Sequence, residues 1–437
     1  MSLLILPHQL FDCVYFPDFI KNVVIYEHPH YFDKYNYNKK KIILHRASMK
    51  CYADELRSKK CNYKVKYVLR TSKLSLPKSY YVFDPIDKIK LPDGHNILRT
   101  PGLLLSRDDY EEYQKKTKKF IFNNFYLWSK KKLKLYEELV SLDSQNRKVK
   151  PDDVKPPPLC EISDTDKKYV KKAIRFCSKY YGKNYGTTKD FQYPVTRKTA
   201  KKWLRYFLEK KFNLFGPYQD YVSKDLFDFH SVLSSSLNIG LLCPSEIMVA
   251  IEPYRKKVLD NSFEGFVRQL FWREYQAYCY EYVDLKSMDF FKTKKKITND
   301  WYEGTLGIPP VDDLIKSGFE KGYIHHIGRL MFCGCWFVLS EIKKEDVFRW
   351  FMEFAIDSYE WVMCQNVYDM VMFSSGGITM RRPYICGSNY IVRNSHYRKS
   401  DPWCDEWDKA YRKFCLKHKD KLWKFRYYFP ILRKKKT

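Results

Sequence analysis

Short hydrophobic runs alternate with helical patterns in the first part of the chain. Strand-like runs occupy Leu3–Leu6, Val23–Tyr26, Lys64–Leu69, Tyr80–Phe83 and Asn96–Leu98. The first two are continuously apolar, as is typical of buried parallel strands, and the pattern over Lys41–Lys59 predicts a helix. This alternation predicts a doubly wound α/β domain with a parallel sheet. No GxGxxG fingerprint is present, so dinucleotide binding there is not supported.

A polar, proline-rich stretch separates this part from the rest of the chain. It runs from Ser141 to Pro158 and is typical of an exposed linker. Beyond it, long helical patterns cover Thr199–Phe212, Glu264–Val283, Ile324–Ile342 and Lys344–Met363. We predict an α/β domain over residues 1–140, a linker over 141–160 and a larger all-α domain over 161–437.

The charge of the chain favours a polyanionic partner. The formal net charge is +29, and lysine runs such as Lys39–Lys41 and Lys294–Lys296 concentrate it locally. Nucleic acid is the simplest such partner, although solvated charge runs in a lysine-rich protein remain the alternative. Aromatic residues make up 18% of the chain, which suits contact with bases or a planar cofactor as well as core packing.

Cysteine usage and hydropathy indicate the compartment. Thirteen cysteines at irregular spacings do not form a disulfide framework. No hydrophobic run approaches the length of a membrane span, and Met1–Pro7 is too short for a signal peptide. We expect a reduced, monomeric, intracellular protein, in cytoplasm or nucleus, that does not bind a membrane.

Two polar motifs in the helical part are candidates for chemistry. The segment His230–Gly240 carries serines before an apolar stretch, so it can hold phosphate or simply cap a helix. His325 and His326 are adjacent, and on a helix they point about 100° apart, which disfavours joint binding of one metal. One of them can transfer a proton near neutral pH, with a structural pair as the alternative.

Two further segments combine polar and aromatic side chains. Arg268–Tyr275 presents a guanidinium, an amide and a large aromatic surface, and Tyr359–Asn366 presents a carboxylate, an indole and an amide. Each alone fits a partly buried amphipathic helix. Their presence in one helical domain favours a shared pocket.

These segments together resemble the photolyase and cryptochrome family. The segment Ser231-Val232-Leu233-Ser234 followed by Leu237-Asn238-x-Gly240 is similar to the family's flavin-phosphate loop, and Trp272-Arg273-Glu274 resembles its flavin-pocket helix. More specifically, the chain looks like the prokaryotic iron–sulfur (6-4) photolyases and their cluster-free relatives. The supporting stretches are Phe215–Asp220, His325–Met331, Tyr359–Asn366, Ser375–Gly377 with Arg382–Tyr384, and Tyr390–Ile391 with Ser395–Tyr397, together with Leu6–Leu10 and Lys41–Leu56.

The resemblance implies an FAD bound in the helical domain. Asn366 is then expected near the redox-active edge of the flavin, and Trp361 is a candidate electron donor for photoreduction. The implied cofactor-binding residues are Tyr218, Ser231, Val232, Leu233, Ser234, Arg268, Trp272, Arg273, Arg329, Glu360 and Asn366. The implied catalytic residues are His325, His326, Gln269, Trp361, Tyr390 and Tyr397.

Two departures from the iron–sulfur relatives matter. No cysteine lies at Pro310–Asp313, upstream of the paired histidines, and Cys404 and Cys415 are too far apart for a Cys-x2-Cys motif. A four-thiolate site therefore lacks ligands, and we predict no iron–sulfur cluster and no other metal. Asn394 stands where relatives usually carry methionine, which affects the details of the lesion site.

The activity that the resemblance implies is light-driven repair of ultraviolet-damaged DNA. Gln269 stands near the place where cyclobutane-dimer enzymes of a related class carry glutamate, which favours the (6-4) photoproduct as the lesion. The alternatives are a cyclobutane pyrimidine dimer photolyase, a cryptochrome-type photoreceptor without repair, and a basic DNA-binding protein without flavin. A lumazine-type antenna in the N-terminal domain, near Glu27, is a further candidate, with an ordinary surface carboxylate as the alternative.

Overall fold

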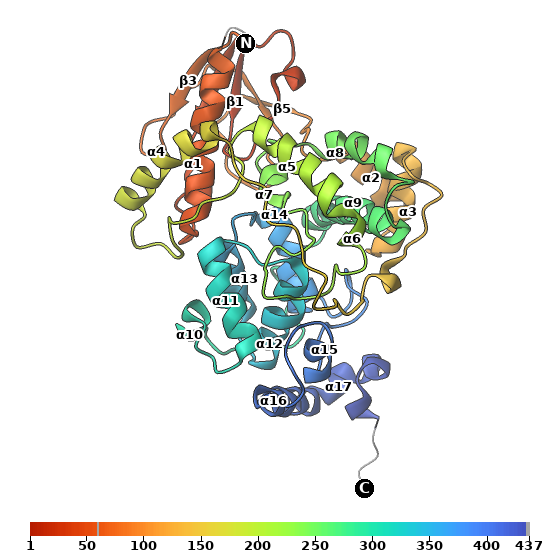
Figure 1. Cartoon of the computed structure of the whole chain (residues 1–437). Helices are drawn as coiled ribbons and strands as arrows, with labels where there is room; N and C mark the ends of the chain where they lie inside the picture. Colours follow the sequence, from red (N-terminus) through yellow and green to blue (C-terminus); the bar gives the residue numbers. More distant parts are fainter. Residues whose placement is uncertain (59–60, 434–437) are drawn as a thin grey trace.

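The computed structural model of the chain describes residues 1–58 and 61–433. A parallel sheet lies at one end of the molecule and the helices α16 and α17 at the other, with most helices between them (Figure 1). The sheet carries the N-terminus of the chain. This arrangement confirms the predicted combination of a parallel α/β part with a mostly helical remainder.

Five parallel strands form the sheet in the order β3-β2-β1-β4-β5. The strands are β1 (Ser2–Ile5), β2 (Asn22–Tyr26), β3 (Lys64–Val68), β4 (Tyr80–Phe83) and β5 (His95–Leu98). In the central register, Leu3 pairs with Val23 on one side and with Tyr81 on the other. All five predicted strands are confirmed. Buried apolar runs mark β1, β2 and β4, as is typical of parallel strands, whereas β3 and β5 are more exposed.

The two faces of the sheet are covered differently. Leu3 and Ile5 face the main core together with α1 (Lys39–Arg57), which begins at the Asn38 cap and packs beside α4. Leu4 and Val82 face the opposite side, where the irregular segments before and after β4 supply Leu74, Leu76, Ile89 and Leu91. The predicted end of the first helix at Lys59 lies outside the described residues.

The helices of the remaining chain surround a large hydrophobic core. Between the sheet and residue 260 they are α2 (Arg107–Lys116), α3 (Phe122–Leu133), α4 (Asp164–Tyr180), α5 (Arg197–Lys210), α6 (Phe212–Phe215), α7 (Ser234–Asn238) and α8 (Pro244–Ile251). Then follow α9 (Asp260–Tyr282), α10 (Asp300–Glu303), α11 (Pro309–Lys321), α12 (Cys335–Leu339), α13 (Lys344–Phe354), α14 (Glu360–Met363), α15 (Ser388–Arg393), α16 (Trp403–Lys417) and α17 (Lys419–Leu422). Two π-helical segments are η5 (Gly328–Gly334) and η6 (Cys364–Val371). Short 3-10 segments are η1 (Cys13–Tyr15), η2 (Pro29–Tyr31), η3 (Asp143–Gln145), η4 (Glu252–Tyr254), η7 (Trp423–Tyr428) and η8 (Pro430–Leu432).

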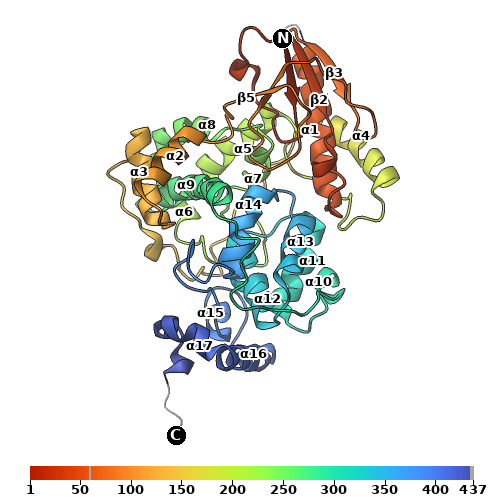
Figure 2. The ribbon, with the colours of Figure 1, turned by 180° about the vertical axis from the view of Figure 1, so that it is seen from behind.

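Two of the predicted long helices are interrupted. The pattern over Lys344–Met363 is not one helix, because α13 ends at Phe354 and α14 begins at Glu360. The break is stable because the Ser358 hydroxyl donates to the carbonyl oxygens of Met352 (2.9 Å) and Ala355 (2.8 Å). Figure 2 shows α14 between α9 and α13. The pattern over Ile324–Ile342 contains η5 and α12 instead of one regular α-helix.

The carboxyl edge of the sheet contacts the helical part directly. The loop after β4 presents Asp87, whose carboxylate accepts a hydrogen bond from the Trp361 backbone N–H at 2.8 Å. The loop after β1 presents His8, whose ring lies 5.9 Å from that of Tyr359. Order β2-β1-β4 makes this edge the topological switch point of the sheet, where α/β folds bind ligands or partner elements.

The segment after the sheet also contacts the helical part. In α3, the Phe122 ring lies 4.2 Å from that of Trp272 in α9. Asp143, within the predicted linker, forms an ion pair with Arg268 at 2.8 Å. The division at residues 140 and 160 stays a prediction. None of the helices among the described residues is both long and apolar enough to span a membrane.

Candidate functional site

A cavity of about 260 Å³ lies within the helical part. Its walls come from the loop before α7 and from α7, α9, η5 and η6, with apolar side chains such as Phe266 and Leu330 between the polar groups. The predicted site residues that line it are Ser231, Val232, Leu233, Ser234, Gln269, Trp272, Arg273, His325, His326, Arg329 and Asn366. Segments nearly 140 residues apart therefore form one concave surface, as expected for a ligand site.

The helix α9 supplies one wall through a simple spacing. Gln269, Trp272, Arg273 and Gln276 all line the cavity. They follow one another at i, i+3, i+4 and i+7, which places them on one face of an α-helix. The helix is buried on almost every side, so this polar face is directed toward the cavity and not toward bulk solvent.

One end of the cavity is built around Asp357. Arg329 donates to both of its carboxylate oxygens, at 3.0 and 3.1 Å. The Ser234 hydroxyl donates to the same carboxylate at 2.7 Å, and the Asn238 side-chain amide donates to the Asp357 carbonyl oxygen at 2.8 Å. Both contacts come from the Arg329 Nη2, and together with the Ser234 bond they fix the direction of the Asp357 carboxylate.

Arg273 lies beside this end of the cavity. Its guanidinium donates to the Asn238 side-chain oxygen at 3.3 Å and to the Gly102 carbonyl oxygen, and it lies 4.7 Å from the Trp361 ring. Desolvation lowers the pKa of this guanidinium, although the nearby Glu274 carboxylate raises it. No carboxylate of the described residues forms an ion pair with Arg273. A buried cation of this kind is suited to an anionic ligand group.

Several buried polar atoms at the cavity make no hydrogen bond with the described residues. They are the Trp272 Nε1, the Asn366 Oδ1, the His230 Nε2 and both ring nitrogens of His325. The Asn366 amide is held by a bond from its Nδ2 to the Val362 carbonyl oxygen at 3.0 Å. Because buried polar atoms normally have partners, these atoms indicate a ligand that supplies both donors and acceptors.

The paired histidines both line the cavity. They do not share a helix, because His325 lies in the extended segment before the helix begins. Which of the two donates a proton stays a prediction. The His325 ring stacks on His230 at 4.4 Å and is buried, whereas His326 is exposed at the cavity mouth.

The protein environment keeps these imidazoles neutral. Desolvation lowers the pKa of His325 well below its usual 6.5, and the neighbouring His230 and His326 lower it further. The surrounding protein atoms lower the pKa of His326 to about 4, helped by Arg329 and Arg268. Near pH 7 each ring therefore offers one N–H donor and one acceptor nitrogen.

Trp361 and Arg268 lie behind the lining of the cavity. Trp361 is buried beneath the Arg273 guanidinium. Arg268 forms ion pairs with Asp143 at 2.8 Å and with Glu264 at 3.4 Å. Its positive charge also helps to lower the pKa of His326. Their roles as electron donor and flavin ligand stay predictions.

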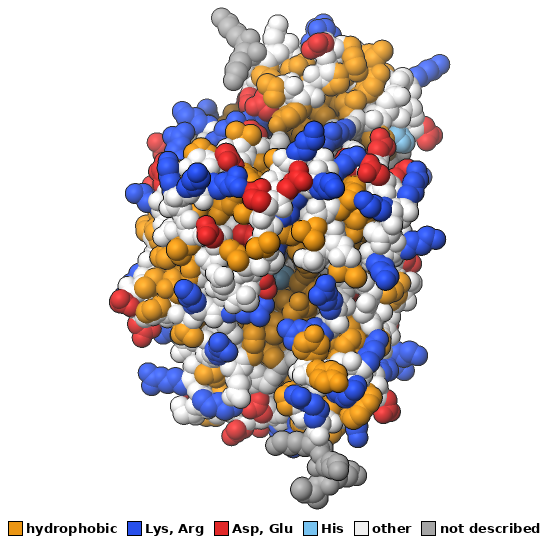
Figure 3. All heavy atoms as spheres, turned by 90° about the vertical axis from the view of Figure 1, so that its right-hand side faces the viewer, with side chains coloured by type: hydrophobic (Ala, Val, Ile, Leu, Met, Phe, Trp, Pro, Cys, Tyr) orange, Lys and Arg blue, Asp and Glu red, His pale blue; other side chains and the backbone are white. Residues whose placement is uncertain are grey.

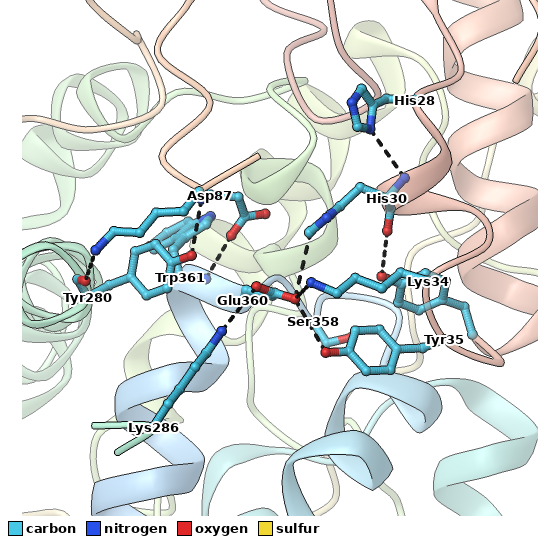
Figure 4. A network of polar contacts seen from close by, with 12 residues as sticks. His28, His30, Lys34, Tyr35, Asp87, Tyr280, Lys286, Ser358, Glu360 and Trp361 are labelled. Atoms are coloured by element: carbon cyan, nitrogen blue, oxygen red, sulfur yellow. Dashed lines mark hydrogen bonds and ion pairs between the residues drawn. The ribbon is translucent and has the colours of Figure 1, made fainter. Parts of the chain in front are cut away.

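Glu360 belongs to a separate polar cluster between the sheet loops and the helical part. Its carboxylate pairs with Lys34, with Lys286 at 3.5 Å and with His30 at 3.9 Å, and it accepts a bond from Tyr35 at 3.3 Å (Figure 4). Burial raises the pKa of Glu360, but the lysines outweigh this effect and hold it below its usual value. The carboxylate is thus already neutralised within the protein and does not line the cavity.

Three predicted tyrosines also lie outside the cavity lining. Tyr218 packs against Phe229 with ring centroids 5.6 Å apart. The Tyr397 hydroxyl donates to the Asp313 carboxylate at 2.5 Å. Tyr390 lies in α15, where burial and the Asp220 charge raise the pKa of its hydroxyl. Their functional roles are untested by the geometry.

Sequence reasoning did not single out Asp357 or His230 as site residues. Asp357 falls inside Lys344–Met363, which the pattern predicted as one continuous helix, so nothing in the periodicity set it apart. His230 was noted only as the start of the serine segment. The available signal for Asp357 was an isolated Asp-Ser pair between apolar residues, at Ala355-Ile356-Asp357-Ser358-Tyr359.

The remaining predictions concern an antenna chromophore near Glu27 and the absence of a bound metal. Glu27 follows β2, is fully buried, and pairs with Arg46, while the Tyr67 hydroxyl donates to it at 2.6 Å. Its carboxylate therefore already has partners within the protein, and the antenna stays a prediction.

Within residues 1–58 and 61–433, no group of three or more His, Cys, Asp or Glu side chains is arranged to hold a metal ion. The absence of an iron–sulfur cluster also stays a prediction.

Comparison with known proteins finds similarity to one family. A family model described as deoxyribodipyrimidine photo-lyase-related protein matches residues 3–81 and 75–193. Over 267 residues the chain is 33% identical to the (6-4) photolyase of Agrobacterium fabrum. The chain is thus similar to the photolyase-related protein family over its N-terminal part. The resemblance seen in the sequence is confirmed.

The similarity to the Agrobacterium (6-4) photolyase is partial in extent. It covers 59% of this chain and 52% of that relative, so the chain matches about half of the relative's length. An uncharacterised protein of Acanthamoeba polyphaga mimivirus is 46% identical over 80 residues, which are 18% of this chain and 65% of that protein.

The fold is similar to that of a solved structure. The crystal structure of a bacterial class III photolyase from Agrobacterium tumefaciens matches 96% of this chain and 87% of its own, with a TM-score of 0.58 and 12% identity. At this level of identity the match shows the fold alone. It confirms the predicted architecture of a parallel sheet followed by a mostly helical part.

Proposed function

We propose that this chain is an FAD-dependent photolyase that repairs ultraviolet-damaged DNA with light, and that its lesion is the (6-4) photoproduct. The observation that carries the proposal is the convergence of unpaired buried polar atoms in the cavity. Trp272 Nε1, Asn366 Oδ1 and the His325 nitrogens need partners, and the walls between them are apolar. A planar heterocycle with amide-like edges supplies such partners.

The residues present fit FAD. Arg273 provides a partly buried cation without a carboxylate partner among the described residues, which suits a pyrophosphate. Ser231 to Leu233 line the cavity next to it. Beside it, the Asp357–Arg329 pair offers further fixed polar groups, and the Asn366 amide elsewhere in the lining can contact a heterocycle. When bound and reduced, FAD supplies the light-driven electron for dimer cleavage.

The chain's own residues then bind the lesion and manage its proton. The net charge of +29 attracts DNA, and a damaged base pair, which pairs poorly, is the one most easily flipped out of the stack. His326, exposed at the cavity mouth, meets an entering base first and offers its N–H. The lesion phosphates raise its pKa, so a larger fraction of the ring carries a transferable proton in the complex than in the free protein.

The (6-4) photoproduct is favoured over the cyclobutane dimer by two cavity residues. A proton donor is needed for the group transferred in the (6-4) lesion, and a histidine pair lines the cavity. Gln269, a neutral amide, also lines it. The likeness to a (6-4) photolyase supports the same choice.

Product analysis tests the proposal. The purified protein, chemically reduced, is illuminated with oligonucleotides that each carry one (6-4) photoproduct or one cyclobutane dimer, and the products are separated by chromatography. We expect light-dependent loss of the (6-4) photoproduct and no loss in the dark. Repair of the cyclobutane dimer alone would reassign the lesion, and flavin-loaded protein that repairs neither would contradict the repair activity.

A further inference from the structure

Three large aromatic side chains are exposed together near the C-terminal end. Trp423, Tyr427 and Tyr428 have exposed fractions of 47%, 69% and 51%, and all belong to η7. The neighbouring Leu422 and Phe429 are fully buried. The segment is thus anchored by its apolar residues, while its outer side presents flat rings to solvent.

Cations accompany these rings. The Arg426 guanidinium lies 5.2 Å from the Trp423 ring and 4.9 Å from the Tyr427 ring, and Arg382 lies 4.5 Å from the Tyr428 ring. Neither arginine forms an ion pair with any carboxylate of the described residues. Between residues 419 and 433 the chain has five Lys or Arg and a single carboxylate. Hydrophobic and basic side chains intermingle beside the C-terminal end in Figure 3.

This surface continues toward the cavity. Arg382 lies 5.4 Å from the Tyr384 ring. Arg147 and Asp220 are close enough to Tyr384 for their charges to act on its pKa, which Arg147 lowers and Asp220 raises. Arg147 and Asp220 form an ion pair at 3.3 Å, and Asp220 follows Gln219, which lines the cavity. A polymer that enters the cavity can therefore extend along this line of residues.

We infer that the C-terminal basic–aromatic surface, formed by Arg382, Trp423, Lys424, Arg426, Tyr427 and Tyr428, binds unpaired bases of single-stranded DNA beside the lesion cavity. This inference rests on the proposed function, because DNA is the substrate proposed for the cavity. Aromatic rings stack on bases of any sequence, and arginines and lysines bind the phosphates between them.

Single-stranded DNA fits this surface better than a duplex does. In a duplex the base faces are already stacked on one another, so exposed tyrosine and tryptophan rings have no base faces to contact. An acidic peptide would use the cations but not the row of rings. The alternation of ring and cation over Trp423, Arg426 and Tyr427 matches the alternation of base and phosphate.

Binding of an undamaged single strand tests the inference. Fluorescence anisotropy measures the affinity of the full chain for a labelled oligothymidylate of about 16 nucleotides and for an undamaged duplex of the same length. Tyr427→Ala should weaken single-strand binding about tenfold, the effect of losing one stacked base, and leave duplex binding unchanged. Arg426→Gln should lower the slope of log affinity against log salt by about 0.7.

Tyr180→Ala is the matched control. Tyr180, in α4, is an exposed tyrosine (54%) whose ring lies 5.4 Å from Arg70, and it is remote from α17 in Figure 1. Equal single-strand affinities of the Tyr427 and Tyr180 variants would overturn the inference. So would an effect confined to binding of anionic lipid vesicles. Flavin content and lesion repair are measured on the same preparations, so failure of the proposed function is recognised separately.

Discussion

Asp357 is held by groups from three different segments of the chain. Arg329 comes from η5, Ser234 from α7, and Asp357 itself from the break between α13 and α14. Both members of the ion pair are largely buried, with exposed side-chain fractions of 13% and 8%. Removing one charge of such a pair leaves the other without compensation in a poorly solvated place.

Asp357→Asn is therefore expected to impair flavin retention. The asparagine keeps the shape but leaves the Arg329 charge unpaired, at a cost of about 3 kcal/mol in the free energy of unfolding. Flavin absorbance per chain after purification measures retention, and urea titration measures stability. Asp346→Asn is the control, because Asp346 is equally buried and paired with Arg349 at 3.0 Å but does not line the cavity. Equal flavin contents in the two variants would contradict the role of Asp357.

The histidine pair gives a second prediction. Replacing the proton-donating histidine, either His325 or His326, by alanine should lower repair of the (6-4) photoproduct by about 100-fold, the usual contribution of general acid catalysis. Flavin content should stay unchanged. His396→Ala serves as control, since His396 is half-buried and does not line the cavity. Full repair by both single variants, measured by product chromatography, would remove the histidines from the mechanism.

At this scale the sequence predicted the polar residues that follow a helical spacing or a recognisable motif. Gln269, Trp272 and Arg273 share a helix face, so their convergence on one cavity is visible in the pattern. Asp357 could not be predicted in this way, because its position depends on a helix break that hydrophobic periodicity does not reveal. Glu360 was placed at the flavin by resemblance, whereas the structure pairs it with Lys34 and Lys286.

Among the elements, the strands were predicted best. The apolar run of β1 and most of those of β2 and β4 are buried, whereas β3 and β5 are largely exposed. The observed bounds of all five differ from the predicted ones by one residue at most. The helices at the cavity were predicted less well. Both η5 and η6 are π-helical and carry site residues, Arg329 and Asn366, and such local widening of a helix is frequent at functional sites.

The loop after β4 makes a testable contribution through Asp87. This carboxyl is fully buried, and burial together with the Glu360 charge raises its pKa from 3.8 to about 7, although Lys41 and the Trp361 N–H oppose the shift. A raised pKa means that the folded state binds more protons than the unfolded state between these two values. Ionisation of Asp87 therefore destabilises the fold as the pH rises from about 4 to 7.

Asp87→Asn removes this ionisation and keeps an oxygen for the Trp361 N–H. The variant should gain stability relative to the wild type as the pH rises, by about 4 kcal/mol above pH 7. Urea unfolding at several pH values measures the difference between the two proteins. A difference that does not change between about pH 4 and pH 8 would show that Asp87 ionises as an exposed carboxylate does.

In the whole molecule, the sheet end and the helical part meet at the carboxyl edge of the sheet. Asp87, His8 and Lys41 contact the segment that leads from Asp357 to Trp361. The α/β part thereby positions one wall of the cavity. Composition and periodicity predicted both parts of the fold, but they could not predict this contact, because buried polar residues far apart in sequence form it.

The measurement that tests the central claim most directly is the flavin content of the purified protein. The claim is that the cavity between Arg273, the Asp357–Arg329 pair and the histidines holds FAD. Denaturation of the protein and absorbance spectroscopy of the released cofactor, followed by its chromatographic identification, give the amount of FAD per chain. The account predicts near-equimolar FAD in the wild type. Protein that releases no flavin, and takes none up when refolded with FAD, would contradict the account.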